Sequence, residues 1–412
     1  MTDWNGVSRS ARRMVGTPCF VFSERHARLA LTTLRGFRSS LPLVHWLSLK
    51  TQSIGRLLEA ALGWGLGIEV VSPFELLAAV GSDVPPSRVL VNGVGKQQWL
   101  SRYAVPNLTV HFDSLAEVRA LAEAARDLHW RVGFRCAIPP DIFANAGTEL
   151  VEWNQFGMSV AELRVAAQIL RDAKVKVSGL HFHLHTNVER ACKYRRALEF
   201  VATASQIARV DPEYVDIGGG LPIAGERPMT GPNAACTFNL EEFGHVLRAI
   251  PSKFPTAREV WLENGRFLTG AAGALIVTVL DRKERGERTY LICDGGRTNH
   301  ARLAASEIHD IIVEPNRPGP QRETVVCGPT CGAIDRLGTW MLPESIVPGD
   351  TIIWLNAGAY HIPLETRFSF GLVPVVWFNE NDEAEVVRER ETPEQWWAQW
   401  VRSWRTADAL SR

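Results

Sequence analysis

The chain has 412 residues, of which 46% are hydrophobic and 22% are charged, a composition typical of a globular protein. Its 45 Lys and Arg residues balance its 45 Asp and Glu residues, so no broad field favours nucleic acid or an anionic membrane as a partner. The seven cysteines form no CxxC pair, which argues against a disulfide framework or a zinc ribbon. No apolar run reaches the length of a signal peptide or a membrane span, so we expect a cytoplasmic protein that acts on a small molecule.

The first predicted elements are a strand at residues 17–22 and a helix that begins at Glu24, with Ser23 as its cap. Short apolar runs then alternate with helical stretches. The predicted strands are residues 43–49, 67–71, 88–91, 109–112, 131–136, 176–182, 214–217 and 260–262, and the predicted helices are 56–62, 115–125, 160–173 and 193–208. Regular alternation indicates parallel strands joined by crossovers, and eight of them suit a closed, TIM-like βα barrel of about 250 residues.

After Arg266 the pattern changes to strands separated by turns, with no regular helices. The predicted strands are residues 273–280, 289–293, 324–326, 351–355 and 368–378. We therefore expect an α/β protein with a βα barrel over residues 23–270 and a β-sandwich or β-barrel domain formed by residues 1–22 and 271–412. The strand at 17–22 is expected to join this second domain.

The C-terminal stretch predicts an amphipathic helix. A capping box at Thr392-Pro-Glu-Gln395 precedes Trp396, Trp397, Trp400, Val401 and Trp404 at helical spacing. Its aromatic face is expected to pack on the protein's own fold or on a dimer partner. A membrane surface is the alternative, but only Arg402 and Arg405 supply positive charge nearby.

Lys50 closes an apolar run that predicts a barrel strand, so its amine is expected at the C-terminal mouth, where barrel enzymes carry their reactive groups. A desolvated lysine can form a Schiff base with an aldehyde. The alternative is an ordinary lysine at the end of a strand.

His183 lies in the motif HFHLHTN, where alternation places His181 and His183 on one face of a strand. An imidazole there can lie flat over a planar ring. It can also be a core histidine with satisfied hydrogen bonds, or His181, His183 and His185 can chelate zinc. We expect no metal, because no carboxylate or cysteine partner recurs beside these histidines.

Two further motifs suit an anionic ring compound. Gly218, Gly219 and Gly220 follow a predicted strand, and their backbone amides can approach phosphate closely because no Cβ intervenes; a tight βα turn is the alternative. Glu263 and Arg266 end the last barrel strand, where a carboxylate can hold a ring nitrogen protonated and a guanidinium can grip phosphate. A surface ion pair is the alternative here.

In this order the motifs HWLSLKTQ, HFHLHTN, DIGGGLP, ENGRF, CGPTC and NAGAY resemble those of the fold type III pyridoxal phosphate decarboxylases, which include ornithine and diaminopimelate decarboxylases. The resemblance runs from about residue 17 to about residue 378. It implies that Lys50 forms the internal aldimine with pyridoxal 5'-phosphate, that His183 stacks on the ring and that Glu263 meets the pyridine nitrogen. It implies further cofactor contacts for Arg135, Thr186, Gly218, Gly219, Gly220, Arg266 and Tyr360.

The same resemblance implies an α-decarboxylase that works as a head-to-tail homodimer with two shared active sites. Cys331, from the partner subunit, returns a proton to the carbon that has lost carbon dioxide, a step suited to a thiol of reference pKa about 8.5. Lys50, Cys331, His183 and Glu263 are thus the implied catalytic residues, and Asp294 is implied to lie near the substrate. A small buried hydrophobe is the alternative role for this cysteine.

Departures from the family bear on the substrate, an amino acid or an amino-acid-derived intermediate. Ornithine, lysine and diaminopimelate enzymes carry an acidic residue after the cysteine, which binds the distal amine, whereas this chain has Gly332. We therefore expect a substrate other than ornithine or lysine. Arg302 falls where an arginine binds a distal carboxylate in diaminopimelate enzymes, and is either a substrate ligand or a surface residue. His185 replaces a glycine beside Thr186.

Two other functions fit the same fold. One is a catalytically silent, antizyme-inhibitor-like binding protein, and the other is a racemase using the same cofactor. Silent relatives can lose the lysine or the phosphate ligands, whereas this chain keeps both, so the sequence favours an active decarboxylase.

Overall fold

A computed structural model describes residues 3–143, 154–223, 227–228, 238–300 and 307–401. The chain divides into two compact units, each described by itself. The barrel unit comprises residues 31–224 and 236–268, and the β unit comprises residues 1–30, 225–235 and 269–412. Among the described residues, no helix is long and apolar enough to cross a bilayer.

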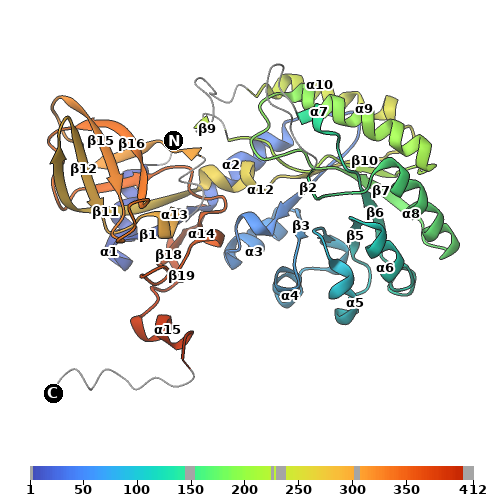
Figure 1. Cartoon of the computed structure of the whole chain (residues 1–412), viewed down its shortest axis with the longest axis horizontal. Coiled ribbons are helices and arrows are strands. Elements are labelled where there is room, and N and C mark those ends of the chain that lie inside the picture. The colour runs from blue at the N-terminus through green and yellow to red at the C-terminus, as the bar shows by residue number, and fades with distance from the viewer. Residues whose placement is uncertain (1–2, 144–153, 224–226, 229–237, 301–306, 402–412) are drawn as a thin grey trace. The chain divides into compact units, whose positions relative to one another are not determined.

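Eight parallel strands close the barrel in the order β10-β2-β3-β4-β5-β6-β7-β8 (Figure 1). They are β2 (Leu43–Ser48), β3 (Gly67–Val70), β4 (Val89–Val91), β5 (Thr109–Phe112), β6 (Arg131–Arg135), β7 (Val177–His181), β8 (Tyr214–Asp216) and β10 (Glu259–Glu263). Strand β10 closes the barrel by pairing with both β2 and β8. The predicted βα barrel and all eight of its predicted strands are confirmed.

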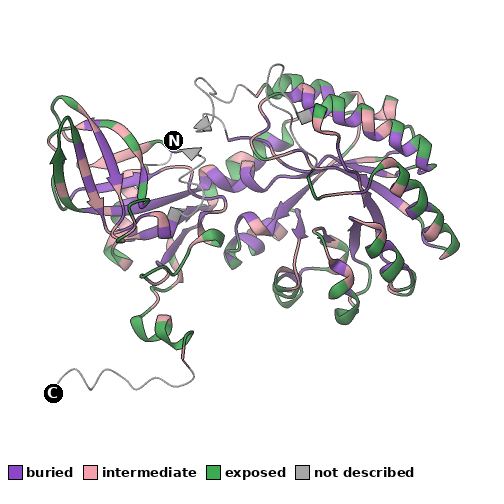
Figure 2. Ribbon diagram, viewed as in Figure 1, coloured by how far each residue is buried: buried purple, intermediate pink, exposed green. Residues whose placement is uncertain are grey.

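Helices alternate with the barrel strands and turn buried faces toward them and exposed faces outward (Figure 2). They are α3 (Gly55–Gly63), α4 (Pro73–Gly81), α5 (Leu100–Tyr103), α6 (Leu115–Asp127), α7 (Pro140–Phe143), α8 (Val160–Asp172), α9 (Ala191–Ala208), α10 (Leu240–Arg248), α11 (Ile250–Lys253) and α12 (Gly265–Thr269). The local sequence determines where α4, α6 and α8 begin. The side chains of Ser72, Ser114 and Ser159 each accept a hydrogen bond from the backbone amide three residues further along. The four helices predicted from periodicity are confirmed.

Large rings fill part of the barrel interior, and glycines on neighbouring strands make room for them. Trp46, Leu90, Tyr214 and Trp261 form one buried cluster, in which the Tyr214 and Trp261 rings stack at 3.7 Å between centroids. A Cβ on Gly67 would lie 2.2 Å from the Trp46 ring, and a Cβ on Gly179 would lie 2.0 Å from the Tyr214 ring. This ring-on-glycine packing fixes the side chains at the base of the barrel.

The β unit is built on a nine-stranded mixed sheet in which β11 has three neighbours. Its strands are β1 (Cys19–Ser23), β11 (Gly273–Arg285), β12 (Arg288–Cys293), β14 (Ile311–Glu314), β15 (Gln321–Cys327), β16 (Arg336–Pro343), β17 (Thr351–Trp354), β18 (Val375–Phe378) and β19 (Ala384–Arg388). The separate short strands β9 (Arg227–Pro228) and β13 (Glu307–Ile308) pair with each other. As predicted, β1 joins this sheet, between β11 and β18.

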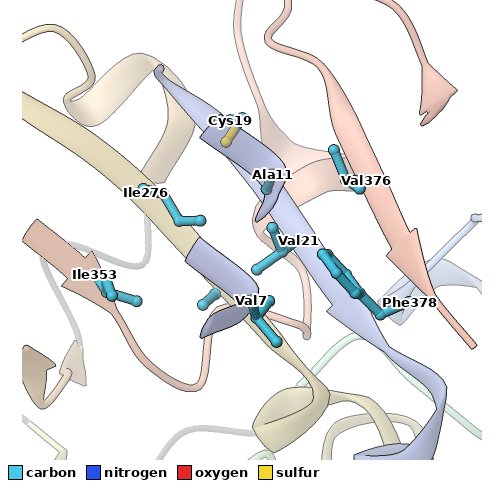
Figure 3. Close-up of a cluster of buried hydrophobic side chains, with 9 residues drawn as sticks. Val7, Ala11, Cys19, Val21, Ile276, Ile353, Val376 and Phe378 are labelled. Carbon is cyan, nitrogen blue, oxygen red and sulfur yellow. The ribbon is translucent and has the colours of Figure 1, made fainter. Parts of the chain in front are cut away.

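Two predictions for this unit were wrong. The strand predicted at 368–378 is a strand only over Val375–Phe378. Short helices are also present after Arg266, namely α13 (Arg297–His300) and α14 (His361–Leu364), and α1 (Trp4–Val15), which was not predicted, precedes β1. The helix predicted to begin at Glu24 is confirmed as α2 (Glu24–Arg35), which follows β1. The buried face of α1 covers the sheet, because Val7 and Ala11 join the core cluster drawn in Figure 3.

The C-terminal helix α15 (Pro393–Ala398) begins with the predicted capping box, which is confirmed. The helix is shorter than its tryptophan spacing suggests, and Trp404 lies outside the described residues. Trp396 donates a hydrogen bond from Nε1 to the Arg367 carbonyl at 2.9 Å, whereas Trp400 is 65% exposed. The aromatic face is therefore only partly covered in this chain.

Candidate active site

Lys50 lies in a short 3-10 turn directly after β2, at the C-terminal mouth of the barrel. Its Nζ lies 3.0 Å from Oε1 and 3.1 Å from Oε2 of Glu69 on β3, a side chain with no solvent exposure. Ser48 donates a hydrogen bond to the same carboxylate. The amine is thus held by a buried counter-charge while part of its side chain stays open to solvent.

Glu263 ends β10 and is also buried. Asn92, which follows β4, donates from Nδ2 to Oε1 of Glu263 and, at 3.2 Å, to Oε1 of Glu69. Burial, reinforced by the charge of Glu69, raises the pKa of Glu263 to about 7, while the charge of Lys50 and the Asn92 hydrogen bond act against this rise. A carboxylate in this setting is poised to share a proton near neutral pH.

His183 follows β7, and its Nδ1 accepts a hydrogen bond from the Gly219 backbone amide at 3.2 Å. Burial lowers the pKa of His183 to about 3, with further lowering by the charges of Arg135 and Lys50. The imidazole is therefore neutral at pH 7, and its proton lies on Nε2 because Nδ1 is the acceptor.

Gly218, Gly219 and Gly220 follow β8 in a tight turn with φ of +68° at Gly218 and +96° at Gly220. The Gly218 amide donates to Oδ1 of Asp216 at 2.9 Å, and Tyr194 donates from its hydroxyl to the Gly219 carbonyl at 2.7 Å. A Cβ on Gly219 would lie 2.2 Å from the Glu263 carbonyl oxygen, and one on Gly220 would lie 2.2 Å from that of His185. The turn is possible only with glycine.

Arg266 lies in α12, one turn beyond Glu263, and is 5% exposed. Its Nε donates to Oγ1 of Thr186 at 3.0 Å, so two side chains predicted to hold phosphate are in contact. Arg135 ends β6, lies over the Phe156 ring at 4.4 Å and approaches Oδ1 of Asp113 at 3.5 Å. Positive charge thus lies after β10, at Arg266, and at the end of β6, at Arg135.

The residues of the barrel mouth fit pyridoxal phosphate. The buried Arg266, which donates to Thr186, suits a phosphate, the neutral His183 suits a planar ring, and the buried Glu263 suits a pyridine nitrogen. In the glycine turn the Gly218 and Gly219 amides donate to Asp216 and His183. Lys50 supplies an amine on the same rim. The barrel unit therefore brings together Lys50, Arg135, His183, Thr186, Gly218, Gly219, Gly220, Glu263 and Arg266.

The other predicted residues belong to the β unit. Cys331 is exposed in the loop after β15, and Tyr360 precedes α14 with φ of +68°. Asp294 accepts hydrogen bonds from the Thr17 hydroxyl at 2.6 Å and the Thr278 amide at 2.8 Å, so its carboxylate joins the segment before β1 to β11. Arg302 lies outside the described residues.

The buried carboxylate of Asp335 organises the loop that carries Cys331. It accepts hydrogen bonds from the Thr330 amide at 2.9 Å, from the Thr330 hydroxyl at 2.6 Å and from the Arg297 amide at 2.8 Å. The Thr330 hydroxyl in turn accepts from the Gly332 amide at 3.3 Å. The segment from Thr330 to Gly332 is therefore held in one conformation on both sides of the cysteine.

Among the described residues, one group has ligand atoms close enough for a metal ion: His111, His181 and Glu263. Both nitrogens of His111 already face other polar groups, Asn92 Oδ1 at 2.9 Å and Tyr214 Oη at 3.0 Å. The set differs from the His181, His183 and His185 alternative considered from the sequence.

Sequence reasoning missed Glu69, Asn92, His111 and Asp216. One signal was available, since Glu69 is a charged residue inside the apolar run 67–71, and a charge within a predicted barrel strand demands a partner. Asn92 follows a strand at the mouth of a barrel, where functional side chains concentrate.

Comparison with known proteins agrees with this site. Residues 32–270 match the family model described as the pyridoxal binding domain of pyridoxal-dependent decarboxylases. The chain belongs to this family of pyridoxal phosphate-dependent carboxy-lyases, and its cofactor is pyridoxal phosphate.

Similar proteins align over nearly the whole chain. The diaminopimelate decarboxylase of Zymomonas mobilis is 26% identical over 92% of this chain and 91% of its own length. That of Actinosynnema pretiosum is 28% identical over 92% of this chain and 87% of its own length. The fold is shared with the M. jannaschii diaminopimelate decarboxylase in complex with L-lysine, at a TM-score of 0.81 and 22% identity, covering 95% of this chain and 94% of that one.

Proposed function

We propose that this protein removes the α-carboxylate of an amino acid whose side chain is neutral or acidic, with Lys50 and Cys331 as the principal catalytic residues. The observation that carries the proposal is the pairing of Lys50 with the buried Glu69 on the same barrel rim as the Gly218–Gly220 turn, Arg266 and Glu263. It is supported by the full-length similarity to decarboxylases.

Bound pyridoxal phosphate supplies an electron sink for the pair of electrons released when carbon dioxide leaves. Lys50 offers the amine that holds the cofactor's aldehyde carbon. Arg266, Thr186 and the glycine turn hold the phosphate, with Tyr360 as a further predicted ligand. His183, a neutral imidazole, would lie against the ring, and Glu263 would hold a proton at the pyridine nitrogen.

The proton that replaces the lost carboxylate comes from the Cys331 thiol in this proposal. We propose a homodimer in which Cys331 of one subunit serves the barrel of the other. Its exposure in the loop after β15 is consistent with that role. Mixing Lys50→Ala and Cys331→Ala proteins, each inactive alone, should then restore about a quarter of wild-type activity, because half of the dimers gain one complete site. No recovery, with subunit exchange shown by mass, would contradict shared sites.

The glycine at position 332 supports a substrate with a neutral or acidic side chain. Related enzymes that act on a distal amine use an acidic residue there, and this chain offers none at that position. A second candidate substrate is diaminopimelate, which the names of the similar proteins favour. As a substrate ligand rather than a surface residue, Arg302 would bind the distal carboxylate of either an acidic side chain or diaminopimelate.

A mass-spectrometric screen tests the proposal. Cofactor-loaded protein is incubated with diaminopimelate and with cationic, neutral, aromatic and acidic amino acids, and the amine left after loss of carbon dioxide is measured. Lys50→Ala is the control and should lose the visible absorbance of the bound cofactor. A normal cofactor spectrum in that variant would show that Lys50 is not the residue that binds the cofactor's aldehyde. Efficient turnover of ornithine or lysine by the wild type would contradict the proposed specificity.

A further inference from the structure

A chain of three buried side chains runs through the barrel interior and ends on Glu263. Tyr214 Oη lies 3.0 Å from Nε2 of His111, and Nδ1 of His111 lies 2.9 Å from Oδ1 of Asn92. Asn92 then contacts Glu263 and Glu69 through Nδ2. The members come from β8, β5 and the end of β4, and all belong to the barrel unit.

The hydrogen bonds in this chain have only one consistent direction. The Glu69 carboxylate, which also accepts from Lys50, can only accept, so the Asn92 amide group must point its nitrogen at Glu69 and Glu263 and its oxygen at His111. His111 therefore donates from Nδ1, and its Nε2 accepts from the Tyr214 hydroxyl. Burial keeps the pKa of His111 well below its usual value and that of Tyr214 well above, which preserves this pattern at pH 7.

Packing holds the chain rigid. The Tyr214 ring stacks on Trp261, and the His111 ring stacks on His181 with centroids 4.8 Å apart. A Cβ on Gly133 would lie 2.6 Å from His111 Cδ2 and 2.7 Å from Tyr214 Oη, so a larger residue there would push the two groups apart. In most barrels aliphatic side chains fill this space. Burying three polar side chains here instead costs free energy of desolvation, which an aliphatic core would avoid.

Other charged or titratable groups face Glu263 from the neighbouring strands. His181 Nε2 lies 3.4 Å from Oε1, and Glu69 adds negative charge beside it. Burial and the charge of Glu263 raise the pKa of the nearby Asp216 well above its usual value, which favours its neutral form. The charge of Glu69 favours protonation of Glu263, whereas Lys50 and Arg135 oppose this. The Asn92 N–H is the neutral donor that favours the ionised form.

We propose that Asn92, His111 and Tyr214 are positioning residues that orient Glu263 toward the cofactor's pyridine nitrogen and favour its ionised form. This inference rests on the proposed function, in which Glu263 meets that nitrogen. Asn92 sets the position of the carboxylate directly. His111 and Tyr214 act through Asn92, by fixing which way its amide group points.

Asn92→Leu tests the chain, because leucine has a similar volume and removes the donor. Asn92→Leu removes a hydrogen bond to the ionised form of Glu263, so Glu263 should gain its proton at higher pH. In the cofactor-loaded variant, the acid-side midpoints of the absorbance titration and of the kcat profile should therefore lie about one pH unit higher than in the wild type. The dissociation constant for pyridoxal phosphate should rise about tenfold. Tyr214→Phe keeps the ring on Trp261 and should shift both midpoints in the same direction by less.

Thr109→Val, on the same strand as His111, is the matched control and should leave the midpoints at the wild-type pH. If Asn92→Leu does not fold, as judged by circular dichroism, Tyr214→Phe decides the question. If Asn92→Leu folds and its midpoints equal those of the wild type, the inference is overturned. The same holds for Tyr214→Phe if it alone folds. The proposed function still stands in either case, provided that the wild type binds the cofactor. A wild-type protein that does not retain pyridoxal phosphate overturns both.

Discussion

Nζ of Lys50 lies 3.0 Å from Oε1 and 3.1 Å from Oε2 of Glu69, so one fully buried carboxylate meets the lysine with both oxygens. The same carboxylate accepts hydrogen bonds from Ser48 and Asn92. These donors satisfy a group that would otherwise be costly to bury. The lysine therefore has a fixed partner on the neighbouring strand.

Replacing this partner should damage catalysis without unfolding the barrel. In Glu69→Gln the shape is kept but the charge and one acceptor oxygen are lost, and we expect kcat/KM to fall about tenfold or more. The charge of Glu69 also helps to raise the pKa of Glu263, so the acid limb of the pH profile should move to lower pH. Steady-state kinetics across pH check both effects, with the exposed Glu59→Gln as control; an unmoved acid limb contradicts the proposed coupling.

Glu263 should make the cofactor-free protein less stable as pH rises. Its pKa is about 7 in the folded state against a reference of 4.5, so the folded state holds a proton that the unfolded state has released between these values. Its stabilising contribution is complete below pH 4.5 and is lost as pH rises through 7, a change on the order of 3 kcal/mol.

Urea unfolding of the wild type and Glu263→Gln at pH 5 and pH 8 measures this effect. The fall in unfolding free energy between the two pH values should be larger for the wild type. The buried His183 has a lowered pKa and changes the unfolding free energy with pH in the opposite sense. Both proteins contain His183, so its contribution cancels when the two falls are compared. Equal falls in both proteins would refute the assignment.

Gly219→Ala should weaken pyridoxal phosphate binding by about tenfold or more. Its Cβ would lie 2.2 Å from the Glu263 carbonyl oxygen, and backbone on both sides would have to shift. Gly63→Ala is the control, because a Cβ added there, at the end of α3, would have nothing within 4 Å. Equilibrium dialysis of the cofactor compares the two; equal affinities would show that the turn does not need glycine.

Asp335→Asn should slow turnover while leaving cofactor affinity unchanged. The substitution removes the charge that holds Thr330 and the Arg297 amide, so the loop around Cys331 loses its fixed conformation. We expect kcat to fall about tenfold, in line with the loss of charge-assisted hydrogen bonds. Single-turnover kinetics and cofactor titration check this, with Asp281→Asn on the exposed part of β11 as control. A parallel loss of cofactor would point instead to a general folding defect.

Gly332→Asp should fold normally and improve activity on diaminopimelate relative to neutral amino acids. A Cβ at this position would meet only Thr330 Oγ1 at 3.5 Å and Ile334 Cγ1 at 3.8 Å, which are ordinary contacts. The added carboxylate would supply the partner that a distal ammonium needs. The ratio of kcat/KM values for the two substrates checks it, with Gly332→Asn as the uncharged control. An unchanged ratio would place the specificity elsewhere.

The barrel was predictable because each buried parallel strand is an apolar run bounded by turns and helices. In the nine-stranded sheet of the β unit, β14, β16 and β19 were missed, and so was the short pair β9 and β13. In β16, for example, exposed and partly buried residues alternate with Leu337 and Leu342, so the apolar signal is sparse. Residues 368–374 include Phe368, Phe370, Leu372 and Val373 but are not a strand, and the two phenylalanines are exposed, which apolar content alone does not reveal.

The same limit applies to the site. Lys50, Glu263 and the glycine turn were predicted as residues at strand ends. Their partners were not, because Asn92 and Glu263 are 171 residues apart and meet only once β10 closes the barrel. The sequence shows each strand end separately, whereas the hydrogen bonds depend on which strands become neighbours.

The ring-on-glycine packing at the base of the barrel couples substitution at each glycine to substitution at one aromatic residue. Tyr214 occupies the volume that a side chain at Gly179 would need, and Trp46 does the same for Gly67. Either partner can change freely only if the other changes with it. Substitutions at these positions should thus be accepted in pairs, a smaller ring arriving together with a larger neighbour, and single replacements should be eliminated by misfolding.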